Sequence, residues 1–160
     1  MDATADELAG VVDLFGGLTR SELERALAEL AFRTDGSSVD EEDLEAAIEA
    51  ALSSFAIVRY EPAAGNSPGG PLFVAGPTAF PSPPDHAEDL PHILEVEHRS
   101  IERERVGEQT RDRYVAAVSD ALEAGDRERI EELLEGSYDI EAWAPIDLED
   151  ERDRLADALE

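Results

Sequence analysis

The sequence predicts a mainly α-helical α+β protein with a small β-hairpin, in which a winged-helix-like N-terminal lobe is followed by a helical C-terminal lobe. Three observations predict this fold class. Apolar residues recur at helical spacing in three N-terminal segments, two short apolar runs then flank a Gly/Pro-rich loop, and the rest of the chain returns to helical spacing.

Three helices are predicted in the first third of the chain. The apolar face of the first consists of Leu8, Val11, Val12 and Phe15. Thr19 and Glu22 have the spacing of a capping box, so a second helix begins there and ends near Asp35-Gly36. Asp40 is a suitable N-cap for the third helix. The apolar face of the third helix carries Leu44, Ile48, Ala51, Leu52 and Phe55.

A β-hairpin is predicted next. Residues 55–60 and 71–75 are rich in apolar, aromatic and β-branched side chains, and the loop 61–70 between them is rich in Gly and Pro. Three helices followed by a hairpin is the element order of a winged-helix domain. The alternative is any small α+β unit that ends in a hairpin.

The chain is expected to divide into a lobe at 1–76, a Pro-rich linker at 77–88 and a helical lobe at 89–160. Because each lobe has only about 80 residues, near the lower end for independent folding, the helical lobe is expected to pack on the first.

Four helices are predicted in the helical lobe. One runs from about Asp89 through Arg99. Gly125-Asp126 combines a helix-ending glycine with an N-cap, which predicts a tight corner between two further helices. The helix after the corner is expected to stop at Gly136, and Asp147 can cap the last one.

The composition is extremely acidic. The 160 residues include 40 Asp+Glu and 13 Lys+Arg, all of them arginine, for a formal net charge of -27. Self-repulsion of this size destabilises a compact chain at ordinary ionic strength, but the Debye length is about 3 Å in 1 M salt. The composition therefore indicates a protein adapted to concentrated salt. Disorder is disfavoured, because the apolar residues fall at helical spacing.

The composition also bears on the compartment and the class of partner. There is no cysteine, and no apolar run approaches the roughly 18 residues that a transmembrane helix needs. The N-terminus carries acids where a signal peptide needs basic residues. We therefore expect a cytoplasmic protein without a membrane span, and the acidic surface disfavours binding to nucleic acid.

No catalytic or cofactor-binding motif occurs in the sequence, which predicts a non-enzymatic protein without a cofactor. DNA reading by the third helix is disfavoured, since its polar positions are acidic and include no arginine. Those positions are Glu41, Glu42, Asp43, Glu45 and Glu49. The predicted function is that of a protein-binding or adaptor module, whose partner is another protein.

One segment is an exception to the acidic background. Its candidate contact residues for an anion or an acidic partner are Arg99, Arg103, Arg105, Arg111 and Arg113. The alternative function is a winged-helix-type transcription regulator that contacts DNA through Arg99–Arg113. The interpretation that we favour is that these arginines form ion pairs along one helix, such as Glu95 with Arg99.

Two smaller groups complete the candidates. Trp143 and Tyr138 are candidate partner anchors, and the competing interpretation places the tryptophan in the core. The three histidines, His86, His92 and His98, are six residues apart. Positions six apart diverge by about 120° around a helix, so no metal site is expected.

Four stretches carry a resemblance to a known family: Gly76–Pro81, Asp89–Leu94, Arg103–Gln109 and Ser137–Pro145. With the spacing between them, they span nearly the whole chain. The sequence resembles an uncharacterised protein family of halophilic archaea. The resemblance implies a cytoplasmic setting and carries no assigned activity, cofactor or site residue.

Overall fold

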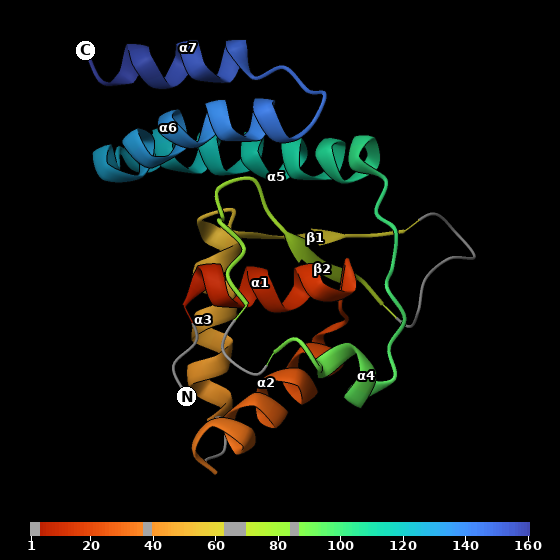
Figure 1. Ribbon diagram of the computed structural model, residues 1–160. Coiled ribbons are helices and arrows are strands. Elements are labelled where there is room, and N and C mark those ends of the chain that lie inside the picture. Colours follow the sequence, from red (N-terminus) through yellow and green to blue (C-terminus); the bar gives the residue numbers. More distant parts are fainter. Residues whose placement is uncertain (1–3, 37–39, 63–69, 84–86) are drawn as a thin grey trace. The chain divides into compact units, whose positions relative to one another are not determined.

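The computed structural model describes residues 4–36, 40–62, 70–83 and 87–160. The chain divides into two compact units, Met1–Ile101 and Glu102–Glu160. Helices dominate both, and the described strands form one antiparallel pair, so the predicted helical α+β class with a small hairpin is confirmed (Figure 1). Among the described helices, none is both long and apolar enough to cross a bilayer.

The first unit is built from helices around a hairpin. Its elements are α1 (Ala5–Phe15), α2 (Arg20–Asp35), α3 (Glu41–Ser53), β1 (Ile57–Tyr60), β2 (Leu72–Ala75) and α4 (Leu90–Leu94). The predicted capping box begins α2, where the Thr19 hydroxyl accepts the Glu22 N–H and the Glu22 carboxylate accepts the Thr19 N–H. The predicted N-cap of α3 is also present, because an oxygen of Asp40 accepts the Glu42 N–H at 2.8 Å.

The strand pairing matches the predicted winged-helix order. β1 and β2 run antiparallel, with Ile57 opposite Ala75. Leu18, in the turn between α1 and α2, exchanges both backbone hydrogen bonds with Phe73 of β2, at N···O distances of 3.1 and 2.7 Å. The turn before α2 therefore borders β2 on one side and β1 borders it on the other, which is the arrangement of a winged-helix sheet.

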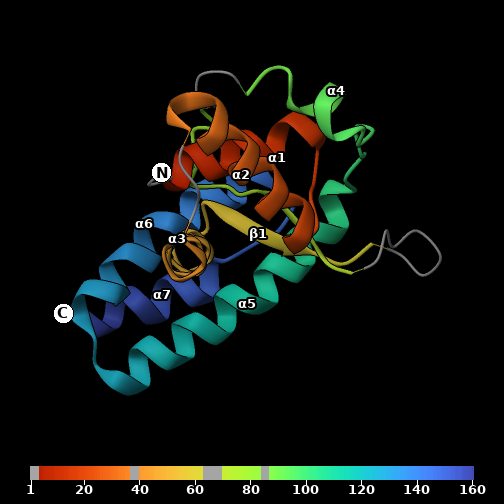
Figure 2. The same ribbon diagram turned by 90° about the horizontal axis from the view of Figure 1, so that it is seen from below.

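One apolar cluster fills the first unit and takes residues from every one of its named elements. α1 lies against β2 and α3 and supplies Phe15, which is completely buried (Figures 1 and 2). Removing such a side chain from water stabilises the folded state by about 1.5–3 kcal/mol. The cluster thus fixes α3 with its apolar face inward and its acidic face outward.

The Pro-rich segment that the sequence predicts as a linker is fastened to the first unit. The Thr78 hydroxyl donates to the Ser54 carbonyl at 2.7 Å, and the Ser82 N–H donates to the Asp6 carbonyl at 3.1 Å. This backbone passes directly over Gly10, where a Cβ would lie 2.4 Å from the carbonyl carbon of Ser82. Only glycine leaves room for so close an approach.

The predicted helix 89–99 is wrong beyond its first turns. α4 ends at Leu94 because Glu95 adopts a left-handed conformation (φ 54°), and the chain continues without helix to Ile101. Leu90 is completely buried in the core of the first unit. The boundary between the units therefore follows Ile101, later than the predicted linker 77–88. Packing of the helical lobe on the first lobe stays a prediction.

The second unit consists of three helices, α5 (Arg103–Ala124), α6 (Arg127–Trp143) and α7 (Glu149–Ala158). Figure 2 shows the three lying side by side. The predicted corner is confirmed: Gly125 takes a left-handed conformation (φ 64°), and an oxygen of Asp126 accepts the Arg129 N–H at 3.1 Å. The predicted cap at Asp147 is wrong by one position, because Leu148 is the N-cap of α7 and makes no side-chain cap hydrogen bond. Asp147 still contacts the start of the helix, where one of its oxygens accepts the Glu149 N–H at 3.0 Å.

The predicted stop at Gly136 is wrong, because α6 continues through it to Trp143. Leu133, Ser137 and Ile140 are buried along one face on both sides of the glycine. A glycine inside a helix costs about 1 kcal/mol relative to alanine. Continued burial of this face outweighs that cost, so the candidate anchors Tyr138 and Trp143 both belong to α6.

Candidate functional site

The outward face of α3 is strongly acidic. All the acidic side chains predicted to face outward are exposed: Glu41, Glu42, Asp43, Glu45 and Glu49. The opposite face of the helix is held in the core by Leu44, Ile48 and Ala51. α3 contains no arginine, so its own sequence supplies nothing to neutralise these carboxylates.

The acids of α3 differ in what they do for the helix. Those in the first turn lie at the positive end of the helix dipole, where carboxylates are stabilising. Glu45 and Glu49 lie beyond that turn and are four residues apart on one face. Like charges at this spacing destabilise a helix by about 0.2–0.5 kcal/mol. This pair therefore gives the helix no local advantage.

Arg99 binds within the first unit instead of pairing along a helix. Its guanidinium makes two parallel hydrogen bonds to Glu22, Nη1 to Oε1 at 2.6 Å and Nη2 to Oε2 at 2.9 Å. Nη1 also donates to the Gly17 carbonyl at 3.0 Å, and the Arg99 N–H donates to the Phe15 carbonyl at 2.7 Å. The predicted Glu95–Arg99 pair is thus replaced by a contact across 77 residues of sequence.

The two parallel hydrogen bonds between Arg99 and Glu22 shift the pKa of both side chains. Hydrogen bonding by Arg99 holds the pKa of Glu22 down, from its ordinary 4.5 to about 2, against the opposing effect of burial. The same hydrogen bonds raise the pKa of Arg99. Both side chains are largely buried, and the Arg99 backbone lies so close to Gly16 (φ 80°) that a Cβ there would be 1.9 Å from the Arg99 carbonyl oxygen. Arg99 is therefore a clamp on the turn between α1 and α2.

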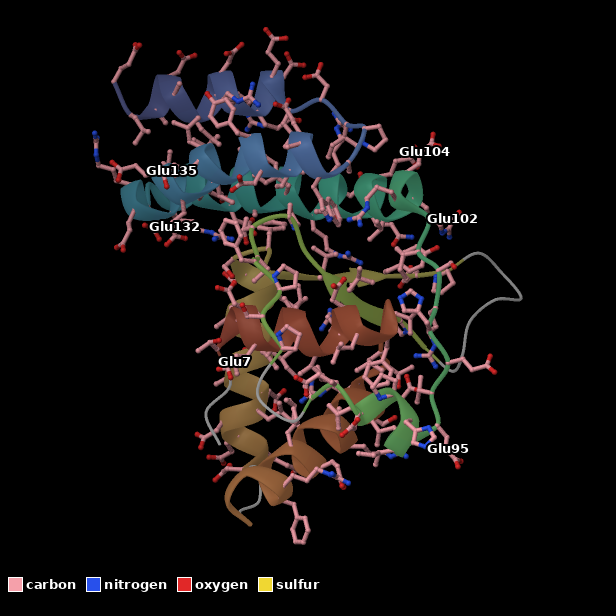
Figure 3. The ribbon with its side chains drawn as sticks, in the orientation of Figure 1. Glu7, Glu95, Glu102, Glu104, Glu132 and Glu135 are labelled. Carbon is pink, nitrogen blue, oxygen red and sulfur yellow. The ribbon has the colours of Figure 1, made fainter. Side chains whose placement is uncertain are left out.

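The other four candidate arginines belong to α5 in the second unit. Arg103 lies over the ring of Trp143, 4.6 Å from its centre. Arg111 donates to the Asp147 carbonyl at 3.4 Å and approaches Glu151 at 3.8 Å. Arg105 and Arg113 are half-buried, and neither is without a partner. The structure therefore divides the predicted segment between two units and engages its arginines internally. Glu102 and Glu104 lie at the start of the same helix (Figure 3).

An arginine of the same chain is stacked on the ring of each predicted aromatic anchor. Trp143 is half-buried under Arg103, and Tyr138 is 58% exposed with Arg152 stacked 4.2 Å from its ring centre. Arginine over an aromatic face is an attractive contact of about 0.5–1 kcal/mol at exposed sites. The tryptophan is thus neither fully in the core nor free at the surface.

A polar cluster that the sequence analysis did not anticipate lies inside the second unit. The Tyr114 hydroxyl donates to the Leu133 carbonyl at 2.6 Å, and the Ser137 hydroxyl donates to the Leu134 carbonyl at 2.7 Å. Arg152 of α7 donates to Ser137 at 3.0 Å and forms an ion pair with Glu141 of α6. Burial raises the pKa of Tyr114 to about 12, while the neighbouring Ser137 hydroxyl acts in the opposite direction.

Two oxygen atoms near this cluster have no hydrogen-bond partner in the described parts of the chain. They are Thr110 Oγ1 of α5 and Glu151 Oε2 of α7. Thr110 is completely buried, and Glu151 is 8% exposed. An unsatisfied buried polar atom costs about 1–3 kcal/mol, and more if it is charged. Helical spacing could have predicted that Thr110 is buried, because Thr110 lies between Val106 and Tyr114 on the buried face of α5. Nothing local marks Glu151 as buried.

Some predicted features fall partly or wholly outside the described residues. His86 and residues 63–69 of the predicted hairpin loop are among them. His92 and His98 are both exposed. Within the ranges that the structure describes, no three His, Cys, Asp or Glu side chains are grouped so as to hold a metal ion.

The sequence profile of DUF7109, a family of unknown function, matches residues 6–160. The chain belongs to this family. The expectation of an uncharacterised family is thereby confirmed, with the DUF7109 match covering both structural units. No curated protein and no solved structure matches the DUF7109 chain.

Proposed function

We propose that this DUF7109 protein is a non-enzymatic adaptor that binds a basic surface of another protein through the acidic face of α3. The observation that carries the proposal is the pair Glu45 and Glu49. Both side chains are exposed, they repel each other at helical spacing, and neither lies in the first turn, where an acid would stabilise the helix. A partner that brings lysine or arginine to this face relieves the repulsion on binding.

The position of α3 in the fold supports a binding role. It is the third helix of a winged-helix-like unit, the element that such domains present to their ligands. Duplex DNA carries one negative charge per about 1.7 Å of its axis, so an acidic α3 repels it. A basic protein surface has the opposite charge, and charge complementarity at direct contact selects partners by disfavouring those of like charge.

The arginine segment offers no comparable support for the alternative of a DNA-binding regulator. Arg99 is bound to Glu22, Arg103 covers Trp143, and Arg111 contacts the chain around Asp147. A DNA backbone would have to compete with these contacts for each guanidinium. We therefore put forward only the protein-binding function.

The proposed setting is the cytoplasm of a salt-adapted archaeon. The net charge of -27, carried without a single lysine, supports it. Because salt screens repulsion between carboxylates, we expect the thermal unfolding midpoint to rise as KCl increases from about 0.1 M to molar levels. A midpoint that did not depend on KCl would contradict this setting.

The test of the proposed function uses two variants with the same net charge. Glu45→Gln/Glu49→Gln removes the carboxylate pair from α3, and Glu123→Gln/Glu135→Gln removes two exposed carboxylates from α5 and α6, where Glu135 is marked in Figure 3. Each tagged full-length protein is purified in molar KCl from a salt-adapted host, and the proteins that remain bound are identified by mass spectrometry.

We expect a recurrent protein partner with the wild type and with the control variant, and its loss from the α3 variant. A partner retained equally by all three proteins would place the binding surface elsewhere than on α3. Recovery of discrete DNA fragments instead of a protein would overturn the proposal.

A further inference from the structure

We propose that α7 is a displaceable helix, and that the face of α5 and α6 which it covers binds an amphipathic helix of a partner protein. On this covered face, Ser137 and Glu141 of α6 contact Arg152, and Arg111 of α5 approaches Glu151 at 3.8 Å. This face is a different surface from the acidic face of α3. The proposal for α7 is therefore tested independently of the proposed function.

The composition of α7 makes it the least apolar helix of its unit. Seven of its ten residues are charged, and the buried ones are Glu151 and Leu155, with Leu148 buried just before the helix. α5, in contrast, buries Val106, Tyr114 and Val118 among others. Helices with little buried apolar surface open locally before the rest of a protein unfolds.

Polar contacts supply much of what fastens α7. Arg152 reaches both Ser137 and Glu141, and Glu151 lies 3.8 Å from Arg111, a long ion pair whose arginine is 45% exposed. At this separation, and with one partner half exposed, the Arg111–Glu151 pair contributes little to stability. The contacts of Arg152 with Ser137 and Glu141 depend on one arginine side chain, which a helix of another protein can also provide.

Two buried oxygen atoms without hydrogen-bond partners in the described chain make the packing of α7 on α5 and α6 less favourable. Burial of Glu151 removes Oε2 from water without a partner, and Thr110 Oγ1 on the opposite helix is in the same state. A helix with an apolar residue at the position of Glu151 avoids the first of these penalties. Such a competitor binds this face better than the resident helix does.

The expected partner follows from the residues of α7 that do fit. It is an amphipathic helix with apolar residues seven positions apart, in place of Leu148 and Leu155. It carries an arginine at the position of Arg152, which can reach Glu141, and an apolar residue at the position of Glu151. The chemistry selects a helix that resembles α7 without its buried carboxylate.

The probe is a fluorescent peptide of residues 147–160 that carries the Glu151→Met substitution. It is titrated into three full-length proteins in molar KCl: the wild type, Glu151→Met and, as a matched control, Glu149→Met. Glu149 lies two residues from Glu151 in the same helix, but it is exposed. Hydrogen exchange of the α7 amides is measured on the same three proteins.

We expect the peptide to bind the wild type and the control equally, and to bind the Glu151→Met protein about tenfold more weakly, because its own α7 then competes better. In the wild type the α7 amides should exchange faster than those of α5, and Glu151→Met should slow them about tenfold. Failure of the peptide to bind the wild type would overturn the proposal. So would α7 and α5 amides that exchange together, or a Glu149→Met protein that behaves like Glu151→Met.

Discussion

The two units differ in what they bury. Among the described residues, the first unit buries 24 apolar residues and no polar or charged side chain, whereas the second buries 10 apolar residues together with Thr110, Ser137 and Glu151. They also differ in charge density. The first has 20 acids and 5 arginines over 101 residues, a net -15, and the second has 20 acids and 8 arginines over 59 residues, a net -12.

This difference assigns the two units different sources of stability. The first is held by a continuous apolar core, and its one large electrostatic contact, Arg99 with Glu22, lies at the edge of that core. The second has less apolar surface to bury and relies in addition on a hydrogen-bonded polar cluster. Loss of an apolar side chain should therefore matter most in the first unit, and loss of a polar contact should have smaller effects in the second.

The largest effect is expected from Phe15→Ala in the core of the first unit. Truncation of a completely buried phenylalanine leaves a cavity and lowers the free energy of unfolding by about 3–5 kcal/mol. Urea denaturation in molar KCl, followed by far-UV circular dichroism, measures it. Phe32→Ala is the control, because Phe32 is 69% exposed and its truncation should change stability by no more than about 0.5 kcal/mol. Equal effects of the two would refute the assignment of Phe15 to the core.

The second effect concerns the clamp. Arg99→Ala leaves Glu22 largely buried and without its fork of hydrogen bonds, so we expect a loss of about 2 kcal/mol in the free energy of unfolding. Arg33→Ala removes an exposed pair with Glu29 one helical turn away and should cost about 0.3–0.5 kcal/mol. If both variants lost the same stability, the clamp would be an ordinary surface pair.

The clamp also predicts a dependence on pH. The pKa of Glu22 is about 2 in the folded protein and 4.5 ordinarily, so its contribution to stability is complete above pH 4.5. It is lost as the pH falls from 4.5 towards 2, because the unfolded chain takes up the proton first. Unfolding measured across this range should show a smaller decline for Arg99→Ala than for the wild type. Parallel declines in the two proteins would contradict the role of Arg99.

The smallest effect is expected in the polar cluster of the second unit. Tyr114→Phe removes the hydrogen bond to the Leu133 carbonyl and should lower the free energy of unfolding by about 1 kcal/mol. The raised pKa of Tyr114 adds a second measurement. Its contribution is complete below pH 10 and is lost as the pH rises towards 12. Absorbance at 295 nm should show one tyrosine ionising near pH 12, and this step should be missing from Tyr114→Phe.

The sequence was sufficient where a structure depends on neighbours a few residues apart. The capping box of Thr19 and Glu22, the N-cap at Asp40 and the corner at Gly125-Asp126 all involve backbone groups within four positions. Each could be recognised from residue type and spacing alone. The acidic outward face of α3 followed from the same helical periodicity.

The sequence was insufficient where the partner is distant along the chain. Arg99 had a plausible local partner in Glu95, but its actual partner is Glu22, and no spacing connects the two. The continuation of α6 through Gly136 depends on burial against other helices, which outweighs the low propensity of glycine. The burial of Glu151 has the same origin, since α7 taken alone looks like a solvated charged helix.

Carboxylate footprinting shows directly whether a protein partner binds the acidic face of α3. Exposed carboxylates are labelled with a carbodiimide and an amine, with and without the partner recovered from the host, and the labelled residues are located by mass spectrometry. We predict that the partner protects Glu45 and Glu49, while labelling of Glu123 and Glu135 stays unchanged. Unchanged labelling of Glu45 and Glu49 in the presence of bound partner would contradict the claim.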